Sequence, residues 1–161
     1  MMGRVFQLGD NIDTDQLAPG QYMRGGIEAL AAHCLEAIRP DFAESVRPGD
    51  LIIAGRNFGA GSSREQAAEA LKHLGLAAVI AQSFAGIFYR NAINLGLPVL
   101  VAPDTSGVSD GDSCTLDLEA AKLIVEGREI ALEPISENLQ ILLADGGLVP
   151  HLKKRFAEAR Q

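Results

Sequence analysis

A glycine-rich stretch in the first half of the chain carries the side chains best suited to chemistry. It reads Gly55-Arg56-Asn57-Phe58-Gly59-Ala60-Gly61-Ser62-Ser63-Arg64-Glu65-Gln66 and follows the apolar run Leu51–Ala54. A loop of this kind between a strand and a helix exposes backbone N–H groups, and the helix dipole favours negative charge there. The guanidinium of Arg64 has the two-pronged donor geometry that suits a carboxylate. The stretch therefore predicts an anion site formed by Ser62, Ser63 and Arg64.

The same stretch also has a purely structural interpretation. Ser62 or Ser63 could cap the following helix, with an acidic or amide side chain three residues on completing a capping box. Arg64 would then be a solvated residue of the first helical turn. A cation in that turn opposes the helix dipole, however, so its presence favours a partner or a function. The glycines match neither the P-loop pattern nor the dinucleotide-binding pattern GxGxxG.

An acidic segment, Asp13-Thr14-Asp15, lies in a loop rich in Gly, Asn and Pro. Its carboxylates could bind a cation, orient an arginine, or form local Asx-turns, and the last is the commonest use of such residues. The histidines are expected to be surface or capping residues, since His33, His73 and His151 lie far apart in the sequence.

The two cysteines, Cys34 and Cys114, are 80 positions apart and belong to no CxxC pattern. Neither is followed by histidines at metal-ligand spacing. Both are therefore expected to be structural thiols, and the chain is expected to hold no zinc or iron–sulfur centre by itself.

Composition narrows the class of protein. The 161 residues carry a net charge of −7, which argues against a nucleic-acid surface because phosphate binding needs clustered cations. The apolar runs are far shorter than the ~20 residues that span a bilayer. No apolar signal segment follows the first residues, so a cytoplasmic location is expected.

The order of predicted elements favours an α/β fold of one domain over residues 1–161. Strands at 51–54, 77–81 and 98–102 alternate with helices at 62–74 and 84–95, which is the pattern of parallel βαβ units. The final third is β-rich. Further strands are expected at 5–8, 113–118, 122–125 and 129–132, and further helices at 27–38, 136–144 and 148–159, with residues 9–26 forming a loop.

Three motifs in order resemble one family. They are Gly9-Asp10-Asn11-Ile12-Asp13-Thr14-Asp15, Asn57 through Glu65, and Ser83-Phe84-Ala85 through Gly96-Leu97-Pro98. Together they resemble the small subunit of 3-isopropylmalate dehydratase and homoaconitase, the swivel domain of the aconitase superfamily. The resemblance covers nearly the whole chain and implies a β/β/α swivel-type domain.

The resemblance implies a hydro-lyase acting on a small hydroxy-di- or tricarboxylate. In that family a large partner subunit carries a 4Fe-4S cluster that acts as a Lewis acid, and the small subunit binds none. The motif match makes Ser62 the base, acting as an alkoxide, with Asp15 as a second catalytic residue that orients groups in the site. It makes Thr14, Ser63 and Arg64 substrate contacts.

The resemblance also relates substrate choice to the loop Gln21–Gly26. An apolar side chain there would suit an isopropyl group, whereas Arg24 could pair with an extra carboxylate. The sequence departs from the family at three positions. Ala60 replaces a frequent Cys, Gln66 a usual His, and Gly86 a usual Arg. These departures affect the expected substrate and partner contacts and leave the base intact.

Three functions remain open at this point. The first is the small subunit of 3-isopropylmalate dehydratase in leucine biosynthesis. The second is the small subunit of homoaconitase or of another dehydratase of small hydroxy-diacids. The third is a module that binds carboxylates through the same loop without catalysing a reaction.

Overall fold

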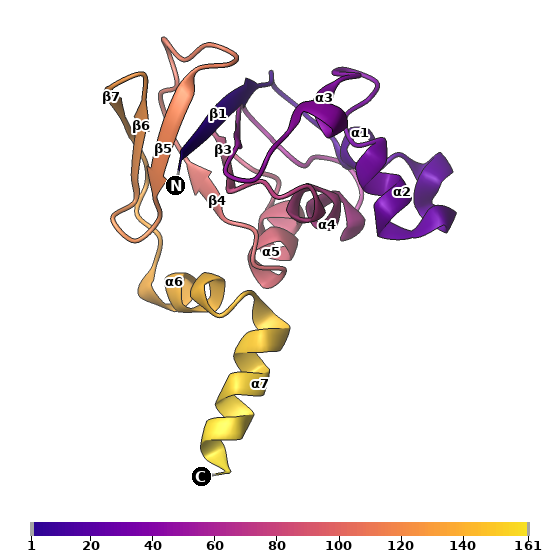
Figure 1. Ribbon diagram of the computed structural model, residues 1–161. Coiled ribbons are helices and arrows are strands. Elements are labelled where there is room, and N and C mark those ends of the chain that lie inside the picture. Colours follow the sequence, from indigo (N-terminus) through magenta and orange to yellow (C-terminus); the bar gives the residue numbers. More distant parts are fainter. Residues whose placement is uncertain (1, 161) are drawn as a thin grey trace.

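A computed structural model describes residues 2–160 and shows a seven-stranded mixed sheet flanked by helices (Figure 1). The strands follow the spatial order β4-β3-β2-β1-β5-β6-β7. Pairing is parallel from β4 to β1 and antiparallel from β1 to β7. The strand β1 (Met2–Gln7) therefore joins two halves of the sheet, with Val5 opposite Leu51 on one side and Gly3 opposite Cys114 on the other. The expected α/β fold with a parallel βαβ core and a β-rich final third is confirmed.

The remaining strands are short and closely match the predicted ranges. They are β2 (Leu51–Ala54), β3 (Ala78–Ala81), β4 (Val99–Val101), β5 (Ser113–Asp117), β6 (Lys122–Val125) and β7 (Arg128–Ala131). The helical segments are α1 (Thr14–Leu17), the 3-10 segment η1 (Gly20–Gly25), α2 (Gly26–Ala32), α3 (Phe42–Ser45), α4 (Gln66–His73), α5 (Gly86–Asn94), α6 (Glu137–Ala144) and α7 (Leu148–Ala159).

The parallel strands are buried on both faces, which explains their continuous apolar sequences. Successive side chains point to opposite faces. Ile52 and Val79 thus join one hydrophobic cluster with the helices, while Leu51 and Ile80 join a second cluster with residues of β5, β6 and β7. Because both halves of the sheet contribute to the second cluster, the sheet curls over itself. Helices, parallel strands and antiparallel strands thereby form the expected β/β/α arrangement (Figure 1).

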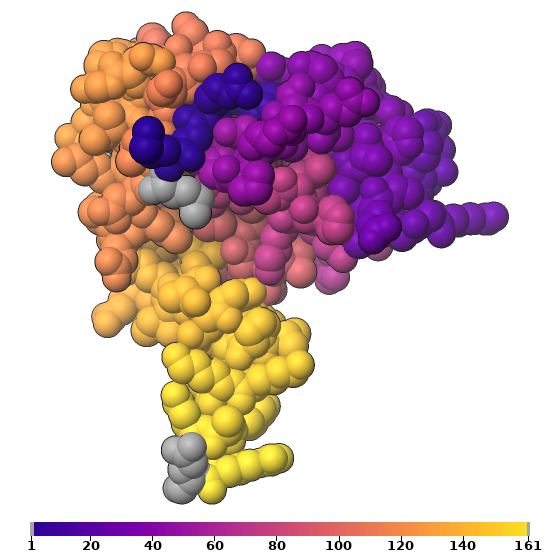
Figure 2. Space-filling model, in the orientation of Figure 1, coloured from indigo at the N-terminus to yellow at the C-terminus, as the bar shows by residue number. Residues whose placement is uncertain are grey.

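Helix α7 extends away from the rest of the molecule (Figures 1 and 2). None of its residues is buried. Its base is held by Asp145, which contacts the imidazole of His151 at 2.7 Å and the ammonium group of Lys154 at 3.2 Å. The two hydrogen bonds hold the pKa of Asp145 below its usual value. No helix within residues 2–160 is both long and apolar enough to pass through a bilayer.

Four local predictions are wrong. Ser62 and Ser63 do not cap a helix, because α4 begins at Gln66 after an N-cap position, Glu65, that makes no side-chain capping bond. The helix expected over 27–38 ends at Ala32 and continues as turns. The segment expected to be a loop over 9–26 contains α1 and η1, and α3 was not predicted. A local capping box starts α1, whereas in the segment expected to complete the helix at 27–38, Leu35 adopts a left-handed conformation and donates its N–H to the carbonyl of Gln16.

The glycine at position 59 shows how tightly the loop after β2 packs. Its φ is +84°, and a Cβ built there would lie 2.2 Å from Cγ of Phe88. We expect Gly59→Ala to lower the free energy of unfolding by about 1–3 kcal/mol, through backbone strain and overpacking. Urea denaturation would measure the loss.

Gly86→Ala is the matched control for this substitution. Gly86 begins α5, and a Cβ there would meet nothing within 4 Å. Alanine is a better helix former than glycine, so this variant should unfold at an equal or higher urea concentration. Equal losses in the two variants would contradict the packing argument.

Candidate functional site

Backbone hydrogen bonds tie together the three loops that follow β1, β2 and β3. Thr14 N–H donates to the carbonyl of Ala60 at 2.8 Å, and Phe58 N–H donates to the carbonyl of Ser83 at 3.1 Å. Ala85 N–H returns a bond to Phe58 at 2.9 Å. The loops thus continue the parallel pairing beyond the strands, as two isolated bridges. They form a continuous edge at the carboxyl ends of the strands, which is the usual ligand edge of such sheets.

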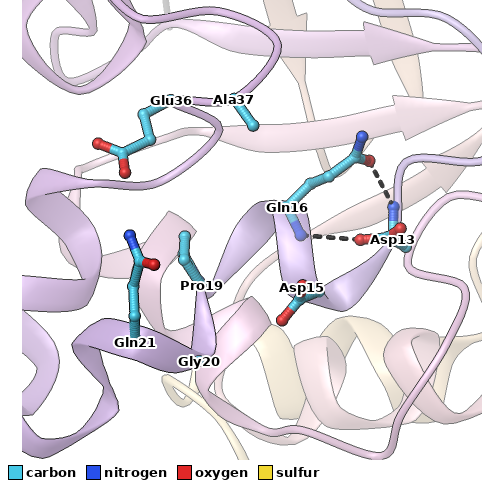
Figure 3. A pocket seen from close by; sticks show the side chains of 8 residues that line it. All are labelled: Asp13, Asp15, Gln16, Pro19, Gly20, Gln21, Glu36 and Ala37. Atoms are coloured by element: carbon cyan, nitrogen blue, oxygen red, sulfur yellow. Dashed lines mark hydrogen bonds between the residues drawn. The ribbon is translucent and has the colours of Figure 1, made fainter.

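The acidic segment on this edge is the start of a helix. The carboxylate of Asp13 accepts the N–H of Gln16 at 2.8 Å, and the Gln16 side chain accepts the N–H of Asp13 at 3.0 Å. This capping box starts α1, and both bonds are drawn in Figure 3. It satisfies two donors that would otherwise be free. As a result Thr14 and Asp15 point in fixed directions, Thr14 being 3 % exposed and Asp15 exposed.

The hydroxyl of Thr14 lies against Ser62. Its oxygen accepts the backbone N–H of Ser62 at 3.1 Å and also lies 3.1 Å from the Ser62 hydroxyl oxygen. Gly61 makes this approach possible, because a Cβ on Gly61 would lie 3.1 Å from the Thr14 oxygen and its φ is +109°. Thr14 was predicted to contact substrate, whereas this geometry directs its hydroxyl to Ser62.

Arg64 forms an ion pair with Asp15. Its Nη1 donates to the Asp15 carboxylate at 2.9 Å and to the carbonyl of Ala18 at 2.8 Å. The hydrogen bond from Arg64 holds the pKa of Asp15 below its usual value. Both bonds use Nη1, which leaves Nη2 and Nε of a fork of donors for a further carboxylate. The partner that a cation near the helix start needs is therefore Asp15 itself.

The structure brings four of the six predicted site residues together, namely Thr14, Asp15, Ser62 and Arg64. Ser63 follows directly and is exposed, with its carbonyl accepting from the side chain of Asn91 at 3.3 Å. Arg24 is exposed on η1, and no hydrogen bond within residues 2–160 links it to the other five.

Two asparagines that position the loop were not singled out from the sequence. Asn57 adopts φ +57°, a left-handed conformation that asparagine tolerates better than most residues. Its N–H donates to the hydroxyl of Ser83 and its side chain donates to Asn11. Asn91 supports the carbonyl of Ser63 from α5. In the sequence, Asn91 is a polar residue beside the apolar positions Phe88 and Ala92 of α5. That placement was the signal that could have identified Asn91.

A pocket of about 390 Å³ lies beside this edge, between α1, η1 and the turn after α2 (Figure 3). Its lining contains three carboxylates, those of Asp13, Asp15 and Glu36. The lining includes no lysine or arginine, so the pocket does not suit a polycarboxylate. On the other side of the edge Ser62 is exposed, and Arg64 keeps donors beyond the one that binds Asp15 and Ala18.

The residues of this chain do not fit an iron–sulfur cluster, which needs several thiolates at one place. Cys34 and Cys114 are both buried, in different hydrophobic clusters on the two faces of the parallel strands. Burial raises the pKa of both thiols, that of Cys114 to about 11. Within residues 2–160, no group of three or more His, Cys, Asp or Glu side chains could hold a metal ion.

Comparison with known proteins relates the chain to one family. Residues 36–104 match the model of the aconitase C-terminal domain. The chain is 51% identical to the methanogen homoaconitase small subunit of Methanothermobacter thermautotrophicus, over 94% of this chain and 90% of that one. It is 50% identical to 3-isopropylmalate dehydratase small subunit 2 of Archaeoglobus fulgidus, over 96% and 95%. The chain belongs to the family of aconitase-type dehydratase small subunits.

A solved structure agrees with this membership. The crystal structure of 3-isopropylmalate dehydratase from Methanocaldococcus jannaschii superposes with a TM-score of 0.93 at 44% identity, covering 99% of this chain and 96% of that one. The three positions that the resemblance marks as expected departures lie along the same edge. Ala60 contributes its carbonyl to Thr14, Gln66 begins α4, and Gly86 begins α5.

The ion pair on this edge predicts how Asp15 titrates. Its pKa should lie below 3.8 in the folded chain, and Arg64→Gln should raise it, since the hydrogen bond from Arg64 is the largest cause of the shift. The unfolded value is about 3.9, so the pair stabilises the fold above that pH and loses this effect as the pH falls through the folded-state pKa.

Carboxyl ¹³C chemical shifts followed by NMR between pH 2 and 6 would measure this. The matched control is Arg56→Gln, which removes an exposed arginine of the same loop and should leave the Asp15 titration unchanged. The same midpoint for Asp15 with and without Arg64 would show that the pair does not form in solution.

Proposed function

We propose that the chain is the small subunit of a two-subunit 3-isopropylmalate dehydratase in leucine biosynthesis, and that residues 1–161 act as one swivel-type domain. The observation that carries the proposal is the contact of the Thr14 hydroxyl with Ser62, next to Arg64, on a chain 50% identical to a small subunit of that name. The reaction is a dehydration and rehydration of a hydroxy-dicarboxylate. A large subunit carrying the 4Fe-4S cluster completes the enzyme.

Ser62 is the base of the proposed reaction. The C–H bond next to a carboxylate breaks, Ser62 Oγ takes the proton, and the electron pair forms the C=C bond. The hydroxyl leaves the neighbouring carbon on the side of the large subunit, so that a proton and a hydroxide, the elements of water, are removed. In the rehydration, hydroxide adds to the carbon that lost the proton, and a proton adds to the carbon that lost the hydroxyl.

A serine alkoxide needs strong stabilisation at neutral pH, and two groups supply it here, the hydroxyl of Thr14 and the guanidinium of Arg64. Thr14 accepts the N–H of Ser62 through its oxygen, so its proton is free to donate to Ser62 Oγ. When Ser62 is ionised, the direction of that bond is fixed, since an alkoxide has no proton to give. The guanidinium of Arg64 adds positive charge, and preorganised donors of this kind stabilise developing anions without reorganisation.

Substrate binding is assigned to Arg64 and Ser63. The free donors of Arg64 hold a substrate carboxylate in two-pronged geometry, and Asp15 fixes the guanidinium in place. Asp15 therefore acts through Arg64 and is a positioning residue. The exposed hydroxyl of Ser63 follows Ser62 and completes the carboxylate contact.

Homoaconitase is the second candidate, and Arg24 is the observation that favours it. This arginine is exposed on η1, in the segment that follows α1. A tricarboxylate has one more carboxylate than isopropylmalate, and a guanidinium is the natural partner for it. A small subunit with the homoaconitase name is 51% identical to this chain. The cytoplasmic location expected from the sequence stays a prediction.

The assigned base is tested with the reconstituted pair of subunits. Ser62→Ala should lower kcat for isopropylmalate dehydration by about 10²- to 10⁴-fold, the usual contribution of general-base catalysis. Thr14→Val removes the donor to Ser62 Oγ together with the acceptor of the Ser62 N–H, and should lower kcat by about ten- to a hundredfold. The absorbance of the product C=C bond would follow the reaction.

Ser109→Ala is the matched control, since Ser109 is an exposed serine in the loop before β5, and its kcat should equal that of the unchanged enzyme. Full turnover with Ser62→Ala would overturn the assignment of the base. Carboxylate binding by the isolated chain, together with an inactive pair of subunits, would instead support the non-catalytic binding module.

Arg24→Val separates the two substrates. If Arg24 pairs with an extra carboxylate, the change should raise KM for homoaconitate by about ten- to a hundredfold, the value of a hydrogen bond to a charged group, and leave isopropylmalate little changed. Steady-state kinetics on both substrates would show this, with Arg56→Val as the control from another exposed loop. A KM for homoaconitate that does not respond would remove Arg24 from the site.

A further inference from the structure

The segment η1, which carries Arg24, has little structure of its own. It is a 3-10 helix of six residues without a side-chain cap, and none of its residues is fully buried. Hydrogen bonds of this helix type have poorer geometry than those of an α-helix. Tyr22 and Met23 pack partly against the main core cluster. The position of η1 therefore depends on contacts with its neighbours.

One contact joins η1 to the loop edge that carries Ser62 and Arg64. The N–H of Gly20, its first residue, donates to the carboxylate of Asp15 and helps to lower the pKa of that group. The same carboxylate accepts from Arg64 at 2.9 Å. The start of η1 is thus fixed to the ion pair of the site.

A second contact joins the middle of η1 to the turn after α2. The ring of Tyr22 stacks on the ring of His33, with centroids 3.6 Å apart and planes 5° from parallel. Nδ1 of His33 lies 2.6 Å from a carboxylate oxygen of Glu36. The hydroxyl of Tyr22 also hydrogen-bonds to Glu36, and these bonds hold the pKa of Glu36 below its usual value. We name these three residues the Tyr22 cluster.

The two contacts lie on opposite walls of one pocket. Glu36 lines it from the turn after α2, and Asp15 lines it from α1, with Gly20 and Gln21 of η1 between them (Figure 3). The Tyr22 cluster therefore holds η1 at a fixed distance from the loop edge that carries Ser62 and Arg64.

Helix geometry connects the cluster to Arg24. In a 3-10 helix, residues two apart differ by about 240° around the axis and by about 4 Å along it. When Tyr22 is held inward against His33, Arg24 points away from the body of the molecule, in agreement with its exposure. An arginine on a segment free to move would lose conformational entropy each time it bound a carboxylate.

We propose that Tyr22, His33 and Glu36 are positioning residues that fix η1 and thereby set the preference of the site between substrates with and without an extra carboxylate. The inference rests on the proposed function and deepens it. Its distinguishing consequence is a change in KM for the tricarboxylate with kcat preserved, because the cluster touches neither Ser62 nor Arg64.

The test uses the reconstituted pair of subunits carrying Tyr22→Ala or His33→Ala. Each variant should raise KM for homoaconitate about tenfold, within the range for loss of an aromatic pair, and leave kcat and the KM for isopropylmalate within about twofold. Tyr22→Phe keeps the stack and should rescue most of the loss. His73→Ala is the matched control, since His73 is an exposed histidine at the end of α4.

Hydrogen exchange of the amides of residues 20–26, measured by mass spectrometry, gives a second readout. Exchange there should be faster in Tyr22→Ala and His33→Ala and unchanged in β2 and β3. Faster exchange with unchanged KM would overturn the inference, as would equal loss of kcat on both substrates or no effect at all. If the unchanged pair turns over neither substrate, the proposed function fails first and this inference falls with it.

Discussion

The site depends on the contacts that the buried hydroxyl of Thr14 makes with Ser62. It joins the loop after β1 to the loop after β2 by accepting the N–H of Ser62 and facing the Ser62 hydroxyl. This is possible because the capping box of Asp13 and Gln16 fixes the start of α1, and because Gly61 carries no side chain where the two loops meet. A change in either loop would move the proposed base relative to the Thr14 hydroxyl.

The charge that the site offers to a ligand is opposite in sign to the net charge of the chain. The chain carries a net charge of −7, yet the edge where an anion would bind presents Arg64. Its pairing with Asp15 fixes the guanidinium and leaves two of its nitrogens free, so one carboxylate positions the cation without using all of its donors. The carboxylates of Asp13 and Glu36 line the neighbouring pocket and make it unsuitable for an anion. Together these charges favour the proposed binding of a carboxylate on the side of Ser62.

The curled sheet explains why a chain of this size can place its functional loops on one edge. Parallel strands buried on both faces need cover on each side, and here helices cover one face while β5, β6 and β7 cover the other. The loops after β1, β2 and β3 lie at the carboxyl ends of parallel strands, which is the usual ligand edge of such sheets. Hydrogen bonds through Phe58 and Ala60 hold these loops side by side.

The sequence by itself determined the strands, the βαβ order and the residues of the glycine loop, because continuous apolar runs and glycine punctuation are local signals. Ser62, Arg64, Thr14 and Asp15 were identified from their types and motifs alone. Only the tertiary structure decided which groups each one contacts. Ser62 does not cap α4, Arg64 finds its carboxylate 49 positions away in Asp15, and Tyr22 finds its stacking partner in His33. These pairs join different structural elements, and no local propensity specifies which side chains will meet once the chain has folded.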